Sequence, residues 1–259
     1  MEHVGSVEQA DEADGRLRAR SLSAYRWTDR LNMERASAIS HFVGIDVQAS
    51  RGLACATLAT DGSTVACRWA PKADDLTTWL ATTLTTAGAS LRSCAVGIDC
   101  PRQPLLRPRE HYWDGSRLSW RARRASDLGH GRHCEVVVSA HRLANPQWTP
   151  LDSAAPPWMR LGFELFAGLV GALRVHEVFP SASYCLLRDQ FLPVQVDLGA
   201  FADGPKDMLD AYVCAATVLE FESGRGCRVG GGDGLGSIVL PRPLPEPIEA
   251  VLHWPSIGG

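Results

Sequence analysis

The tetrapeptide Val-Gly-Ile-Asp occurs twice in this chain, as residues 43–46 and again as residues 96–99. Each copy closes a short run of apolar or small residues with an aspartate, which is typical of a buried strand that ends where a loop begins. If the two strands are parallel neighbours, they lie about 4.8 Å apart, and Asp46 and Asp99 reach the same depth. The surroundings of the two copies differ, so the repeat predicts two carboxylates at one sheet edge rather than a duplicated domain.

The rest of the chain predicts an α/β domain built around these strands. Its apolar runs indicate strands at 41–47, 53–60, 64–69, 93–99, 175–179 and 237–240. Helical spacing and helix-start signals indicate helices at 74–86, 158–173, 181–189 and 206–222. Asp61-Gly62 is a hairpin signal, so the first three strands are expected to form an antiparallel meander. This order favours one mixed sheet with helices on its faces.

Residues 1–40 are rich in charged and small residues without a sustained apolar period, which predicts a poorly ordered tail before a single domain at 41–259. Met33 lies shortly before the first strand and is an alternative start to Met1. No apolar run approaches the about 20 residues of a membrane span, so no membrane partner is expected. The eight cysteines form no Cys-x-x-Cys pair, which favours reduced thiols in a cytoplasmic protein.

Three more acids lie at places where α/β proteins collect their chemistry. Glu177 lies in the strand at 175–179, and Asp207 and Asp210 open the last helix. Asp207 has a structural alternative, because an acid in a first helical turn interacts favourably with the helix dipole. Asp210 lies deeper in an otherwise small and apolar helix and needs a partner, since an unpaired buried charge is costly. An aspartate after a strand is also often a turn residue, so each acid by itself is a weak signal.

Together, the acids predict a metal site. Carboxylates that crowd repel one another unless a cation lies between them. Hard oxygen ligands of this kind suit Mg²⁺ or Mn²⁺. Two such ions about 3.5–4 Å apart can hold both the attacking and the leaving oxygen of a phosphodiester.

Residues 101–133 break the pattern and form an arginine-rich insertion in the predicted domain. Tyr112, Trp113 and Trp120 are interleaved with the arginines, so the segment could hold a phosphate backbone and stack unpaired bases. The alternative is a solvated segment whose arginines pair with local acids. The net charge of −3 requires any binding of an anionic partner to come from such a local patch. The candidate substrate-binding cations are Arg102, Arg121, Arg124 and Lys206.

The motifs Val-Gly-Ile-Asp, Gly-Ile-Asp-Cys-Pro, His-Glu-Val-Phe-Pro-Ser-Ala-Ser-Tyr and Lys-Asp-Met-Leu-Asp-Ala-Tyr-Val-Cys-Ala also carry a family resemblance. The acids on the first and fourth strands resemble those of the RNase H-like superfamily, and residues 206–211 resemble the last helix of RuvC-type resolvases. Over about residues 41–241, the chain is similar to the predicted-nuclease family known as domain of unknown function 429. One motif departs from that family, because Arg132-His-Cys-Glu135 stands where its members tend to have Arg-x-Cys-Asp.

This resemblance implies an RNase H-like fold, with a mixed five-stranded sheet, an antiparallel meander followed by parallel strands, and helices on both faces. It implies that the first strand is central and the fourth lies beside it. It implies Asp46, Asp99, Asp207 and Asp210 as metal ligands and Glu177 as an additional acid near the site.

The leading functional hypothesis is a metal-dependent nuclease or phosphodiesterase that cleaves DNA or RNA with carboxylate-bound Mg²⁺ or Mn²⁺. One alternative is a nucleotide-binding relative of the actin-like ATPases, which need two such domains. Another is a non-catalytic module that binds nucleic acid or protein. The glycine-rich residues 230–236 lack the Lys-Ser/Thr of a phosphate loop and are predicted to be a turn.

Overall fold

The computed structural model describes residues 38–70, 73–188, 194–196, 198–201 and 204–255. Contacts divide the chain into residues 1–38 and 39–259, and the fold described below belongs to the second unit. The predicted tail at 1–40 and the alternative start at Met33 fall almost wholly on residues 1–37, which lie outside the described residues. They stay predictions.

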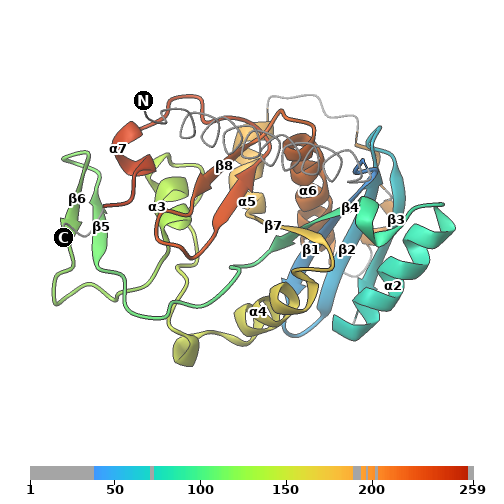
Figure 1. Ribbon diagram of the computed structural model, residues 1–259, viewed down its shortest axis with the longest axis horizontal. Coiled ribbons are helices and arrows are strands. Elements are labelled where there is room, and N and C mark those ends of the chain that lie inside the picture. The colour runs from blue at the N-terminus through green and yellow to red at the C-terminus, as the bar shows by residue number, and fades with distance from the viewer. Residues whose placement is uncertain (1–37, 71–72, 189–193, 197, 202–203, 256–259) are drawn as a thin grey trace, which may run out of the picture. The chain divides into compact units, whose positions relative to one another are not determined.

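The main sheet has seven strands in the order β3-β2-β1-β4-β7-β9-β8 (Figure 1). The strands are β1 (His41–Gln48), β2 (Gly52–Ala59), β3 (Thr64–Ala70), β4 (Cys94–Asp99), β7 (Arg174–Val178), β8 (Cys227–Gly230) and β9 (Ser237–Leu240). β1, β2 and β3 form the antiparallel meander, whereas β1, β4, β7 and β9 run parallel. The prediction of a mixed α/β fold is confirmed.

The predicted count of five strands is wrong for this sheet. β9 pairs in parallel with β7, and β8 pairs antiparallel with β9 across the glycine-rich turn. β8 was not predicted because a four-residue strand with one buried position shows no period of its own. β8 joins the sheet through its antiparallel pairing with β9, and the Gly230–Ser237 pair lies next to the turn of that hairpin.

The two Val-Gly-Ile-Asp strands are parallel neighbours in perfect register. Gly44 pairs with Gly97, and Asp46 pairs with Asp99. Paired residues of parallel strands point to the same face, so both aspartates leave the sheet side by side. The predicted pairing of these two strands is confirmed.

Alternation along these strands decides which helix covers which face. The valines and isoleucines of the repeat pack in one apolar cluster with residues of α2 (Ala73–Thr86) and α4 (Pro157–Leu169). The glycines and aspartates face the other side, which α6 (Pro205–Glu222) covers (Figure 1). A Cβ on Gly44 would lie only 1.8 Å from the Ala211 backbone oxygen. Glycine in the repeat therefore lets α6 lie directly against β1.

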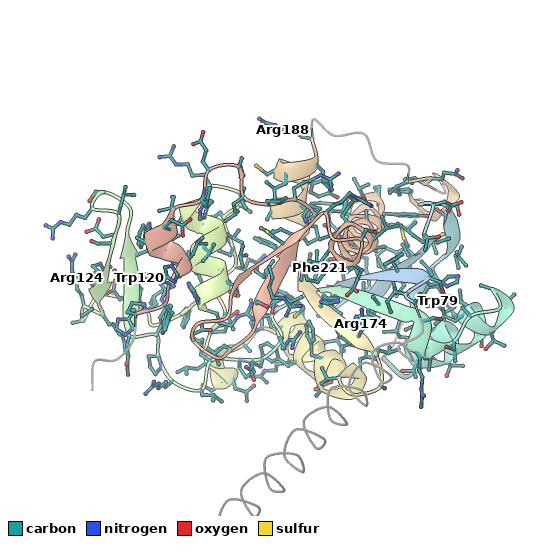
Figure 2. All side chains as sticks on the ribbon, turned by 45° about the horizontal axis from the view of Figure 1, so that its top comes forward. Trp79, Trp120, Arg124, Arg174, Arg188 and Phe221 are labelled. Carbon is teal, nitrogen blue, oxygen red and sulfur yellow. The ribbon has the colours of Figure 1, made fainter. Side chains whose placement is uncertain are left out.

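The insertion at 101–133 contains a separate two-stranded hairpin, β5 (His111–Asp114) with β6 (Ser119–Ala122). Figure 2 shows Trp120 and Arg124 on this hairpin, far from Trp79 of α2. The hairpin is held to the domain partly by Trp120, whose Nε1 donates to the Ala250 carbonyl at 3.0 Å. The described residues also form the α-helices α3 (His133–Ala140), α5 (Pro180–Leu187) and α7 (Glu249–Leu252).

No helix in the described part of the chain combines the length and apolar character needed to cross a membrane. The longest helix among the described residues, α6, has 18 residues and includes four acids.

Candidate metal centre

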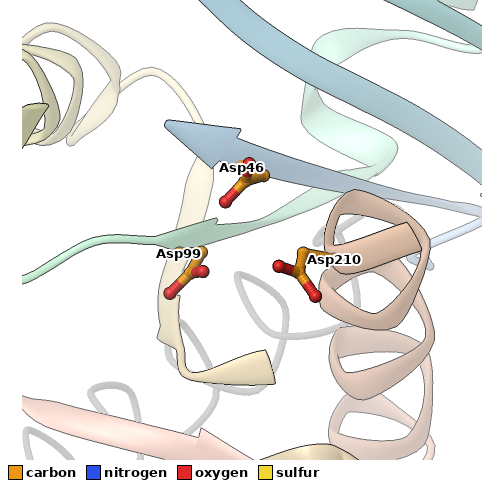
Figure 3. Close-up of side chains that lie close together, drawn as sticks. All are labelled: Asp46, Asp99 and Asp210. Atoms are coloured by element: carbon orange, nitrogen blue, oxygen red, sulfur yellow. The ribbon is translucent and has the colours of Figure 1, made fainter. Parts of the chain in front are cut away.

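Three aspartates meet at the carboxyl ends of β1 and β4. Asp46 lies two residues before the end of β1, Asp99 ends β4, and Asp210 lies in the second turn of α6. One carboxylate oxygen from each residue can be chosen so that all three lie within 4.8 Å of one another. Figure 3 shows the three carboxylates directed toward a common space. Three hard carboxylate oxygens at this spacing suit a divalent cation such as Mg²⁺ or Mn²⁺.

The position of Asp210 follows from the close packing of α6 on the repeat strands. Ala211 is the residue whose backbone contacts Gly44, so Asp210 is fixed one residue from the closest approach of helix and strand. Gly44 and Asp46 are two residues apart and share a strand face. The repeat therefore supplies both the carboxylates and the space that brings the third carboxylate to them.

Neighbouring side chains orient two of the three acids. Gln48 Nε2 donates a hydrogen bond to Asp46 Oδ2 at 2.8 Å. The Tyr184 hydroxyl donates to Asp210 Oδ1 at 2.8 Å, and the Lys206 ammonium pairs with Asp210 Oδ2. Gln48 engages one oxygen of Asp46, whereas Tyr184 and Lys206 together engage both oxygens of Asp210.

The acids perturb one another because they are buried together. Burial raises the pKa of Asp46 to about 6, helped by the charges of Asp210 and Asp207, although the Gln48 hydrogen bond opposes the rise. Burial, followed by the charges of Asp46 and Asp210, also raises the pKa of Asp99 well above its ordinary value. A bound cation would relieve this repulsion, so the electrostatics of the donor set fit a metal ion.

Asp207 lies in the same cavity but outside this group of three. Its carboxylate pairs with the guanidinium of Arg51, whose side chain is 50% exposed. Asp207 and Asp210 thus have different partners, although they are three residues apart on one helix face. The structure gives Asp207 a cationic neighbour, and its role as a metal ligand stays a prediction.

Glu177 also lines the cavity, but it belongs to a different charge network. It pairs across the sheet with Ile98 rather than with Asp99, so its side chain leaves the sheet on the face opposite to the aspartates. The buried guanidinium of Arg132 contacts both carboxylate oxygens of Glu177. The Arg102 backbone N–H adds a 3.1 Å hydrogen bond. Burial raises the pKa of Glu177, and Arg132 opposes that rise.

Arg132 also connects Glu177 to a second buried acid, Glu135 of α3. Glu135 in turn accepts hydrogen bonds from the backbone N–H and the hydroxyl of Thr149. The Arg132-x-x-Glu135 segment of the sequence is therefore a structural ion-pair network beside the metal centre. The sequence marked Arg132 as a member of the arginine-rich segment and as the start of the departing motif Arg132-His-Cys-Glu135, but it did not predict this network.

The predicted substrate-binding cations are only partly brought to the acids. Lys206 lines the cavity, whereas Arg102, Arg121 and Arg124 do not. Arg121 makes two hydrogen bonds to Asp127, at 2.7 and 3.0 Å, which favours the alternative that these arginines pair with local acids. Arg124 is exposed on the hairpin, and the Arg102 Nη2 donates to the Val175 carbonyl.

The cavity around the three aspartates has a volume of about 480 Å³. Six carboxylates and two cationic side chains line it. Both of those cations already contact carboxylates, Lys206 at Asp210 and Arg132 at Glu177. The cavity is therefore strongly negative before any cation enters.

Sequence reasoning missed two orienting residues of the centre. Tyr184 lies in the quoted motif that ends Ser-Ala-Ser-Tyr, and Gln48 lies two residues after Asp46. The need of a buried Asp210 for a partner was predicted, but only the packing of α5 against α6 identifies Tyr184 as one of them. Gln48 could have been found from strand alternation alone, since residues 46 and 48 share a face.

Loss of the Tyr184 hydroxyl should weaken the centre without unfolding it. We expect Tyr184→Phe to reduce metal affinity by about 10- to 100-fold, as is usual when a residue that orients a ligand is removed. Tyr184 is half-buried, and phenylalanine keeps its packing. Titration of Mn²⁺ by calorimetry measures the effect, and an unchanged thermal melting curve is the control. Wild-type affinity in this variant would show that Asp210 is oriented without Tyr184.

The raised pKa of Asp46 predicts how the stability of the metal-free protein depends on pH. The native pKa of about 6 exceeds the ordinary 3.8, so the native state binds a proton that the unfolded state releases. The resulting stabilisation is fully present below pH 3.8 and is lost as the pH rises through about 6, with a size of about 3 kcal/mol. In the presence of a chelator, Asp46→Asn should therefore raise the melting temperature more at about pH 7 than at about pH 5. An equal rise in melting temperature at about pH 5 and about pH 7 would contradict the raised pKa of Asp46.

Comparisons with protein-family models, with curated proteins and with solved structures found no match. The family resemblance therefore rests on the motifs of the sequence, and the chemistry of the site rests on the geometry described above.

Proposed function

We propose that this protein is a metal-dependent phosphodiesterase that acts on nucleic acid, with Mg²⁺ or Mn²⁺ held by Asp46, Asp99 and Asp210. One observation carries the proposal. Two in-register strands and the helix packed on them bring three buried or half-buried aspartates within 4.8 Å of one another. Such a donor set is expensive to bury unless a cation offsets the charge.

We further propose that the fold is RNase H-like. An antiparallel meander, followed by parallel strands on one side of β1, supports this assignment. So does the placement of one acid on β1, one on the neighbouring β4 and one on the last long helix. The two strands β8 and β9 would then extend the five-stranded sheet at the β7 edge.

The charge of the cavity also supports a cation-dependent reaction on phosphate. A phosphodiester carries a negative charge and would be repelled by six carboxylates. A bound divalent cation supplies positive charge for the phosphate and lowers the pKa of water that is to attack phosphorus. Asp46, Asp99 and Asp210 would hold the cation, and Gln48 and Tyr184 would keep two of these carboxylates in position.

Lys206 and Asp207 would act at the rim of the same centre. The side chain of Lys206 is 74% exposed and lies four residues before Asp210 on α6. Although partial burial opposes it, the hydrogen bond to Asp210 raises the pKa of Lys206, so it stays charged. Lys206 would supply the exposed positive charge at the rim for a substrate phosphate. Asp207 would join the ligands only after release from Arg51.

Metal binding and hydrolysis test the proposal directly. The full chain should bind Mn²⁺ in a calorimetric titration and should hydrolyse a phosphodiester in a panel of DNA and RNA substrates only when Mg²⁺ or Mn²⁺ is present. Chelation should remove the activity, and renewed addition of metal should restore it. Absence of Mn²⁺ binding, or hydrolysis that survives chelation, would overturn the proposal.

A further inference from the structure

The cavity extends from the three aspartates to a wall that the proposed metal chemistry does not use. Residues 145–147, with the sequence Asn-Pro-Gln, form part of this wall, and Trp158 at the start of α4 forms another part. Asn145 and Gln147 are exposed, whereas Trp158 is half-buried and packs against the core. Two carboxamides and an indole thus share one cavity with the carboxylates.

This wall is fixed in place by the buried ion-pair network. Thr149 follows Gln147 by two residues, and its N–H donates to Glu135 Oε2 at 3.0 Å. The carbonyl of Thr149 accepts the Gly131 N–H at 2.7 Å. Arg132, which is 1% exposed, ties Glu135 to Glu177. The cavity is therefore formed before a ligand arrives, as is usual for small-molecule sites.

The size and charge of the cavity argue against a long polynucleotide. Its volume of about 480 Å³ falls within the range of about 300–1,000 Å³ that small-molecule pockets occupy. Proteins that hold a nucleic-acid backbone neutralise several phosphates with lysine and arginine. Among the described residues, only Lys206 and Arg132 bring positive charge to this cavity, and Arg132 is occupied by two buried acids. The arginine-rich hairpin does not line it.

The wall does offer groups that recognise a nucleobase. An indole ring can stack on any unpaired base, and such stacking contributes about 1–3 kcal/mol per base. Carboxamides both donate and accept hydrogen bonds, so Asn145 and Gln147 can contact the polar edge of a base. A base whose Watson–Crick edge contacts these carboxamides is unpaired, because a complementary base would occupy the same edge.

We infer that the cavity takes one unpaired nucleotide together with the phosphodiester next to it, so that the substrate is a dinucleotide or the free end of a single strand. The inference rests on the proposed phosphodiesterase function and narrows its substrate. The base lies against Trp158 and the carboxamides, while the phosphodiester lies at the three aspartates. In the reaction, a water oxygen bonds to phosphorus, the bond from phosphorus to one sugar oxygen breaks, and that oxygen takes a proton.

Nucleic acids with and without free ends can test the inferred substrate separately from the proposed phosphodiesterase activity. With Mn²⁺ present, the full chain is given a dinucleotide, a linear single strand, a covalently closed circular single strand and a closed circular duplex. We expect the dinucleotide and the linear strand to be hydrolysed, the latter with release of mononucleotides, and each bond of the circles to be cut at least about tenfold more slowly. Equal rates per bond on circles and linear strands would overturn the inference alone. No metal-dependent hydrolysis of any substrate would overturn the proposed function and the inference with it.

Equilibrium binding tests the wall independently of turnover. With Ca²⁺ as the cation, binding of the dinucleotide is measured by calorimetry for the wild type and for Trp158→Ala, which should lose about tenfold or more in affinity. Asn145→Ala combined with Gln147→Ala changes only exposed side chains and should weaken binding in the same direction, even if Trp158→Ala fails to fold. Glu164→Ala, an exposed site on the same helix, is the matched control. Wild-type affinity in the carboxamide variant and in a folded Trp158→Ala would contradict the inference.

Discussion

Replacing Asp99 with asparagine should reduce metal-dependent phosphodiester hydrolysis by about 1,000-fold or more, a loss of about 4 kcal/mol in transition-state stabilisation. Asparagine keeps the shape of the side chain but removes the negative charge and one hard oxygen. Asp99 pairs with Asp46 in the sheet, and these two residues and Asp210 form the group whose oxygens lie within 4.8 Å of one another. Loss of the Asp99 charge would leave the cation with only two carboxylates of that group. Rates with Mn²⁺ and the affinity for Mn²⁺ measure the effect.

The same variant should be at least as stable as the wild type when metal is absent. The pKa of Asp99 is raised by burial and by its acidic neighbours, so the native state disfavours its charged form more than the unfolded state does. Asp152→Asn is the matched control, because Asp152 is exposed and does not line the cavity. It should change neither activity nor melting temperature. Retention of activity within about tenfold of the wild type by Asp99→Asn would show that the metal is held elsewhere.

Replacing Arg132 with methionine should lower the free energy of unfolding by about 3–5 kcal/mol, the usual cost of leaving a buried charge without its partner. Arg132 is 1% exposed and contacts both Glu135 and Glu177, which are themselves buried. Methionine preserves much of the volume, so the loss comes mainly from two uncompensated carboxylates. In a domain of this size, a loss of this kind corresponds to a fall in melting temperature of about 10 °C.

Two comparisons isolate the buried network from ordinary surface pairs. Arg121→Met removes the ion pair with Asp127 on the hairpin, which is more accessible to water, and should cost about 0–1 kcal/mol. Combining Arg132→Met with Glu177→Gln should recover part of the lost stability, because one of the uncompensated charges is also removed. Denaturant unfolding measures all three variants. Similar losses for Arg132→Met and Arg121→Met would mean that the network contributes little to stability.

The carboxylates of the centre were predictable because strands and helices place side chains by period. The aspartate that closes each Val-Gly-Ile-Asp motif predicts that both carboxylates lie at the same edge of the sheet. In the structure, Asp46 of β1 pairs with Asp99 of β4. Asp210 was predictable as a buried acid in need of a partner. The role of the glycines was not predicted, since a sequence does not show that Ala211 of α6 approaches the backbone at Gly44.

The structure added ion-pair partners that the sequence did not identify. Glu177 was predicted as an additional acid near the site, and it lines the cavity, but its contact with Arg132 places it in a separate buried network. A strand sequence shows that an acid is buried but not which cation it meets. The arginines on the hairpin carry the charge expected of a phosphate-binding surface, yet Arg121 is held by Asp127 in the same hairpin segment.

The sequence by itself determined the alternation of α and β elements, the two strands that end in carboxylates and the acidic helix that follows them, because these depend on local periodicity and on the cost of burying charge. Only the tertiary structure decided which acids meet. Contacts between β1, β4 and α6 assigned Asp46, Asp99 and Asp210 to one group, and Glu177 of β7 meets Arg132 instead. The physical reason is that charge interactions act over a few ångströms in space, whereas sequence patterns describe only neighbours along the chain.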